Sequence, residues 1–173
     1  MPEKGFIQVY YGEGKGKTTA SLGLILRAVG HNWKVLLIQF FKNAFTGEIA
    51  SLQCLPGVTV YRFGSREFVW EGKVSEATKR EFLCGWHLAQ EALKNQEYDL
   101  IVLDELPYAF FYNLLSWEEF RKTMDVRNPQ VEVVITGRKV LQELIDFADL
   151  VSEIRAVKHP YQHGVQAREG VEY

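Results

Sequence analysis

Residues 10–19, which read YYGEGKGKTT, combine the residue types that bind a polyphosphate. Backbone N–H groups of a glycine-rich turn can surround phosphate oxygens, a lysine ammonium can neutralise them, and a threonine hydroxyl can bind magnesium. An apolar run at 6–10 precedes the turn, and residues 17–19 open a helix whose positive end adds to the attraction. We expect the nucleotide to be bound by Gly12, Glu13, Gly14, Lys15, Gly16, Lys17, Thr18 and Thr19.

The spacing of this loop departs in one place from the usual pattern G-x-x-x-x-G-K-[ST]. That pattern would place its first glycine at position 11, where the sequence has Tyr11. We therefore expect Gly12 to form the turn instead. A glycine- and lysine-rich surface loop is the alternative interpretation, and the strand directly before the loop favours phosphate binding over it.

Two adjacent carboxylates end another apolar run, at 98–106. This run reads YDLIVLDEL, so Asp104 and Glu105 stand at the carboxyl end of a predicted strand. In phosphate-loop proteins an acid at such a strand end holds the magnesium ion directly or through water. We predict a metal site formed by Thr18, Glu105 and Asp104. A polar strand end that merely faces solvent is the alternative.

An arginine follows a third apolar run, VEVVIT at 131–136. Arg138 stands just after the carboxyl end of this predicted strand, which is the edge where open parallel sheets bind their ligands. Its guanidinium could contact a phosphate or a ribose of the nucleotide, and a surface salt bridge explains the position equally well.

Strands and helices alternate along the chain, which predicts an α/β fold with a mainly parallel sheet flanked by helices. The expected strands lie at 6–10, 34–40, 58–62, 98–106, 131–136 and 149–154. The expected helices lie at 20–29, 49–52, 75–95, 107–115, 116–124 and 140–147. The helix at 20–29 has almost no polar face, so we expect it to be packed on both sides. Turn residues at Pro160, Gly164 and Gly170 favour a terminal hairpin in the tail 155–173.

Bulk composition limits the class of protein. The 173 residues are 47% apolar, which is enough for a sizeable core, and we expect a single nucleotide-binding domain over 1–173. A net charge of −2 argues against a nucleic-acid-binding surface, and no run approaches the length of a membrane span. The sequence has no secretory leader, so we expect a cytoplasmic protein. Cys54 and Cys84 are expected to be buried or half-buried free thiols.

Seven segments together resemble the P-loop ATP:corrinoid adenosyltransferases, which act on cob(I)alamin or cob(I)yrinic acid a,c-diamide. These segments are YGEGKGKTT, LGLILRAVGH, KVLLIQF, EFVWEG, YDLIVLDEL, VVITGR and RAVKHPYQHGVQAREGVEY. They occur in the order found in the family and cover almost the whole chain. The family's loop also lacks the first glycine, which accounts for Tyr11.

The resemblance implies a RecA-like P-loop NTPase fold, a homodimer and a specific reaction. The 5′-deoxyadenosyl group of ATP is transferred to the Co(I) of a reduced corrinoid, and triphosphate is released. Lys17 would stabilise the leaving triphosphate, and Mg²⁺ or Mn²⁺ would be bound by Thr18 and Glu105, with Asp104 as the alternative ligand or a supporting acid. An electron donor such as a flavodoxin-type protein would reduce the cobalt.

The segment EFVWEG matches the family's F-x-W motif. By this resemblance Phe68 and Trp70 cover the lower face of the cobalt and drive off its axial ligand, which makes Co(II) easier to reduce. The alternative is that the two aromatic side chains only anchor a loop. Arg138 matches the arginine of the family's TGR motif near the nucleotide.

Two differences from the family concern the ends of the chain. Many members have a longer segment before the first strand, where this sequence has only residues 1–5, and the tail has Gln166 and Arg168 in place of an expected lysine and glutamine. We therefore assign no role to any tail residue. A RecA-like ATPase or small-molecule kinase with the same loop, or a corrinoid carrier without catalysis, are the competing hypotheses.

Overall fold

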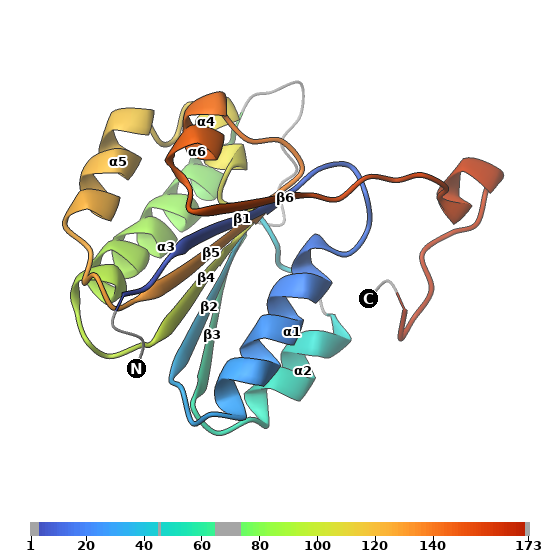
Figure 1. Cartoon of the computed structure of the whole chain (residues 1–173). Helices are drawn as coiled ribbons and strands as arrows, with labels where there is room; N and C mark the ends of the chain where they lie inside the picture. Colours follow the sequence, from blue (N-terminus) through green and yellow to red (C-terminus); the bar gives the residue numbers. More distant parts are fainter. Residues whose placement is uncertain (1–3, 45, 65–73, 172–173) are drawn as a thin grey trace.

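The computed structural model describes residues 4–44, 46–64 and 74–171. They form a six-stranded sheet in which every strand pair is parallel, in the order β3-β2-β4-β5-β1-β6 (Figure 1). The strands are β1 (Ile7–Tyr11), β2 (Val35–Phe40), β3 (Val58–Phe63), β4 (Leu100–Asp104), β5 (Glu132–Gly137) and β6 (Leu150–Glu153). The predicted α/β fold with a parallel sheet is therefore confirmed, and it is consistent with the P-loop NTPase fold.

Helices cover both faces of the sheet (Figure 1). Helices α1 (Lys17–Val29) and α2 (Gly47–Gln53) lie on one face, where Ile25 and Leu52 belong to one cluster of buried apolar residues. The second cluster lies on the other face. It joins residues of the strands to residues of α3 (Glu76–Lys94), α4 (Tyr108–Phe111), α5 (Trp117–Asp125) and α6 (Gln142–Phe147).

The interior strands read as unbroken apolar runs because helices cover both of their faces. All six residues of β2 and all five of β4 are buried, whereas the edge strand β6 is largely exposed. The predicted interior strand at 34–40 is thus confirmed. Because the strands are parallel, their carboxyl ends all lie at one edge of the sheet, where the predicted functional residues meet.

Helix α3 follows the predicted pattern closely. Ser75 accepts a hydrogen bond of 3.1 Å from the Thr78 N–H, as an N-cap residue should. The expected apolar stripe is buried at Phe82, Trp86, Ala89 and Leu93. The cap and the stripe together fix where this helix begins and which side faces the sheet.

Three expectations are wrong. Helix α1 is not packed on both sides, because α2 and the sheet cover only one side and Leu26 is 56% exposed on the other. The described tail residues 155–171 contain no hairpin, because Pro160 begins a 3-10 helix (Pro160–His163) that Gly164 ends in the left-handed conformation. Cys54 and Cys84 are free, as expected, but both are exposed.

The helices of the described residues are those of α1 to α6 and the short 3-10 helix of the tail. None of them combines the length and the apolar character that crossing a bilayer requires.

Candidate functional site

The glycine-rich loop joins β1 to α1 at the carboxyl edge of the sheet. Gly12 and Gly16 have φ values of 114° and 122°, which side chains strongly disfavour. A Cβ on Gly14 would lie 2.8 Å from the carbonyl oxygen of Ile154. The Gly12 N–H donates to the Arg138 carbonyl over 3.1 Å and the Gly14 N–H to the Ile154 carbonyl over 2.8 Å. The loop is therefore anchored to the chain segments that follow β5 and β6, and Gly12 and Gly14 are required for that close approach.

Lys17 turns back into the loop that precedes it. Its Nζ donates hydrogen bonds of 2.7 Å to the carbonyl oxygens of both Gly12 and Gly14, and the side chain is buried. Burial lowers the pKa of Lys17 from its usual value. Phosphate oxygens in the loop would offer this ammonium stronger partners than two neutral carbonyls.

Asp104 ends β4 and is fully buried. One carboxylate oxygen accepts hydrogen bonds from the Thr136 hydroxyl and, over 3.0 Å, from the Thr18 hydroxyl. The other accepts from the Gln39 amide over 3.0 Å and from the Lys42 ammonium over 2.7 Å. With four donors around it, Asp104 is better placed to orient its neighbours than to bind a metal ion directly.

Glu105 differs from its neighbour in almost every respect. Its φ of 62° is unusual for a residue with a side chain, and its N–H donates to the Thr136 hydroxyl over 3.2 Å. One oxygen, Oε2, is buried without a hydrogen-bond partner among the described residues. Burial raises the pKa of Glu105, and Lys42 is the strongest opposing influence. This oxygen is the best candidate for a direct metal ligand.

The donor set suits a small hard cation. Thr18 and Glu105 line one cavity of about 670 Å³ together with Lys17 and Lys42, and oxygen ligands are the ones that Mg²⁺ prefers. No cluster of three or more His, Cys, Asp and Glu side chains that could hold a metal ion occurs in the described part of the chain. A metal ion here would therefore complete its coordination with phosphate oxygens and water.

The tail returns to this cavity from the far edge of the sheet. After β6 the chain runs outward as an arm and its end comes back beside α1 (Figure 1). Gly170 and Val171 line the cavity, and the Lys15 ammonium donates a hydrogen bond of 3.0 Å to the Val171 carbonyl. The phosphate loop is thus bordered by the sheet on one side and by the tail on another.

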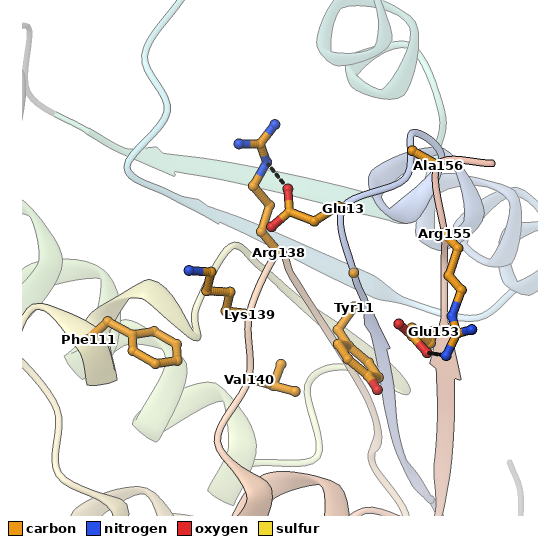
Figure 2. Close-up of a pocket in the computed structure, with 10 residues that line it drawn as sticks. Tyr11, Glu13, Phe111, Arg138, Lys139, Val140, Glu153, Arg155 and Ala156 are labelled. Atoms are coloured by element: carbon orange, nitrogen blue, oxygen red, sulfur yellow. Dashed lines mark hydrogen bonds and ion pairs between the residues drawn. The ribbon is translucent and has the colours of Figure 1, made fainter. Parts of the chain in front are cut away.

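A second cavity, of about 650 Å³, lies at the ends of β1, β5 and β6. Figure 2 shows Phe111 and Tyr11 on opposite sides, with Lys139 and Val140 between them, and the Arg138 side chain pointing toward Glu13. Arg138 forms an exposed ion pair with Glu13 at 3.8 Å, which agrees with the predicted salt bridge. It also lines the cavity, which leaves the predicted ligand contact open. Arg138 also lines a third cavity of about 600 Å³ under the tail, with His159 and Tyr161.

The structure brings most of the predicted site together. Residues 15–19 of the loop and Glu105 line one cavity, and the fully buried Asp104 is joined to this set by the hydrogen bond that it accepts from Thr18. Gly12, Glu13 and Arg138 line the second cavity, and the Gly12 N–H donates to the Arg138 carbonyl. Phe68 and Trp70 lie outside the described residues.

Three polar residues of the site were missed by the sequence interpretation, namely Gln39, Lys42 and Thr136. Each stands within or just after the last positions of an otherwise apolar strand. A polar residue at that place in a buried strand is the signal that could have found them, because only a functional or hydrogen-bonded group is tolerated there.

Comparison with known proteins identifies the family. A family model described as ATP:corrinoid adenosyltransferase BtuR/CobO/CobP matches residues 3–173. Corrinoid adenosyltransferase CobA of Salmonella typhimurium is 38% identical over 99% of this chain and 87% of its own length. The corrinoid adenosyltransferases of Escherichia coli K12 and Pseudomonas aeruginosa are 37% and 34% identical over 99% of the chain, which covers 87% and 85% of their lengths.

The matched region includes every segment on which the resemblance was based, so the predicted family is confirmed. The chain therefore belongs to the ATP:corrinoid adenosyltransferase family, whose members transfer the adenosyl group of ATP to a corrinoid.

Proposed function

We propose that the protein joins the cobalt of a reduced corrinoid to C5′ of ATP and that it uses the phosphate loop to stabilise the leaving triphosphate. The observation that carries this proposal is the position of Lys17, whose ammonium lies 2.7 Å from two loop carbonyls inside the cradle. A cation held there is placed to meet negative charge on a polyphosphate.

The reaction is a substitution at carbon. The Co(I) of the substrate supplies an electron pair to C5′, the new cobalt–carbon bond forms, and the bond from C5′ to the triphosphate oxygen breaks. That oxygen leaves with the electron pair of the broken bond. Lys17 and the loop N–H groups can stabilise this developing charge because they are oriented before the reaction begins.

Thr18 and Glu105 are the residues that would hold a Mg²⁺ or Mn²⁺ ion, and Asp104 would orient Thr18 through their hydrogen bond of 3.0 Å. When bound, such an ion neutralises charge on the triphosphate. The support for this assignment is the buried and unpartnered Oε2 atom of Glu105.

Phe68 and Trp70 are proposed to control reduction of the cobalt. An apolar group at the lower face offers no donor atom, so loss of the axial ligand would favour reduction of Co(II). Phe68→Ala and Trp70→Ala should therefore impair use of a Co(II) corrinoid with a reductant and spare use of a Co(I) corrinoid reduced beforehand. Product formation from both substrates should be followed by absorbance, and equal losses with both would contradict this role.

The remaining features are proposed from the resemblance to the family. We infer a cytoplasmic homodimer that receives electrons from a flavodoxin-type donor. Light scattering of the purified protein tests the dimer, because a monomeric mass at working concentration would exclude it.

The decisive test identifies the phosphate product. Reduced corrinoid and Mg·ATP should yield adenosylated corrinoid and triphosphate in equal amounts, measured by absorbance and anion-exchange chromatography. Orthophosphate or a phosphorylated acceptor as the main product would favour an ATPase or kinase instead. ATP bound without any product would favour a carrier.

A further inference from the structure

We call Asp104, Glu105, Thr18 and the side chains that bond to Asp104 the acid cluster. The cation of this cluster is the side chain of Lys42, which follows β2. Its Nζ lies 2.7 Å from Asp104 Oδ2, 3.3 Å from Thr18 Oγ1 and 3.9 Å from Glu105 Oε1. These three oxygens come from the three residues assigned to the metal site. An ammonium therefore lies next to the Thr18 hydroxyl, which is a proposed metal ligand, and next to Oε1 of the Glu105 carboxylate, whose other oxygen is the second proposed ligand.

The backbone before Lys42 is fixed in an unusual conformation. Phe41 has a φ of 60°, which turns the chain away from the direction of β2. Its ring stacks on Phe82 at 5.8 Å and meets Tyr112 edge-on at 5.5 Å. The aromatic packing compensates the strained turn and aims the next side chain at the acids, so the position of Lys42 is built into the fold.

The Lys42 ammonium balances the charge of only one of the two carboxylates. Asp104 is fully compensated, but Lys42 is 3.9 Å from the nearer Glu105 oxygen, and the other Glu105 oxygen has no hydrogen-bond partner among the described residues. A single positive charge thus balances Asp104 and leaves Glu105 without a close cation and with one oxygen that accepts no hydrogen bond. A divalent ion carries the additional charge that two carboxylates need.

We propose that Lys42 is a positioning residue that holds the acid cluster in the absence of metal and is displaced toward the triphosphate when the metal enters with ATP. This inference depends on the metal site of the proposed function. A metal ion without nucleotide would have to approach the ammonium of Lys42, and like charges at such distances repel. With ATP present, the phosphates provide Lys42 with a new partner. Lys42 therefore makes metal binding depend on the nucleotide.

The test measures Mn²⁺ binding without corrinoid, so that no transfer occurs. Lys42→Met and Lys42→Gln should bind Mn²⁺ in the absence of ATP at least about tenfold more tightly than the wild type, because the repelling charge is gone. Electron paramagnetic resonance of free Mn²⁺ gives the affinity. Mn²⁺ should also raise the melting temperature of the two variants more than that of the wild type, a measurement that remains possible if they are less stable.

Two charge controls separate this role from a structural one. Lys42→Arg keeps the charge and should bind Mn²⁺ as weakly as the wild type, and Lys122→Met removes an exposed lysine on α5 without effect. If neither neutral variant binds Mn²⁺ more tightly than the wild type, Lys42 does not weaken metal binding in the absence of ATP, and the proposal is wrong. Formation of adenosylated corrinoid and triphosphate by the wild type is measured separately, so failure of this inference is distinguishable from failure of the proposed function.

Discussion

The phosphate loop and the acid cluster each contain a lysine held by oxygen atoms, but they are built in opposite ways. Lys17 contacts carbonyls only three and five positions earlier in the chain. Asp104 accepts hydrogen bonds from residues 32, 62, 65 and 86 positions away. The lysine of the loop can therefore exchange its partners without disturbing the fold, whereas the cluster connects several elements of the sheet. We expect changes in the loop to affect chemistry and changes in the cluster to affect both chemistry and stability.

The largest effect should come from the loop. Lys17→Ala should lower the rate of adenosyl transfer about a thousandfold, since it removes the cation that we propose stabilises the leaving triphosphate. The melting temperature should change little, because the contacts of Lys17 lie within the loop. Product formation from a corrinoid reduced beforehand measures the rate, and calorimetry measures the melting temperature. A large loss of stability would show that the loop is not independent of the fold.

An intermediate effect on the rate, combined with a loss of stability, is expected in the cluster. Asp104→Asn removes the buried carboxylate that pairs with Lys42. Because the Lys42 side chain is one-third exposed, we expect the free energy of unfolding to fall by only about 2 kcal/mol. It should also slow adenosyl transfer about a hundredfold, because asparagine has only one acceptor oxygen and its NH2 group must face one of the two pairs of donors, which disturbs the arrangement that orients Thr18. Urea denaturation and the transfer assay measure the two effects. An unchanged free energy of unfolding would mean that the acid cluster, like the loop, contributes little to the stability of the fold.

The smallest change in stability is expected at Glu105, and it is a gain where Asp104→Asn gives a loss. Burial raises its pKa, so the folded protein favours the protonated carboxyl, and this contribution to stability is lost as pH rises through the raised pKa. The neutral Glu105→Gln variant avoids that loss. In EDTA at neutral pH it should melt at a higher temperature than the wild type, and the difference should disappear in acid.

The same Glu105→Gln variant should transfer the adenosyl group about a hundredfold more slowly, because an amide is a poor metal ligand. Thermal melts between pH 4 and pH 8 test the stability effect, for which Asp104→Asn is the matched comparison. A lower melting temperature at neutral pH would contradict the view that Glu105 is held at a cost to the fold.

Much of the site could be predicted because its chemistry is local in sequence. The loop is recognisable from Gly12 to Thr19, and Asp104 and Glu105 are conspicuous after a buried strand. The family motifs were equally visible. The roles of Asp104 and Glu105 could not be separated, because adjacent residues in a sequence carry no information on which one is surrounded by donors and which one turns into the cavity.

The sequence by itself determined the fold class, the phosphate loop and the family, because apolar periodicity and motif spacing are properties of neighbouring residues. Only the tertiary structure decided how the acids are used. Gln39, Lys42 and Thr136 reach Asp104 from three segments because β4 lies between β2 and β5 in the sheet. Strand order was not predicted, and without it the ammonium of Lys42 could not be placed beside Thr18, Asp104 and Glu105, the residues of the proposed metal site.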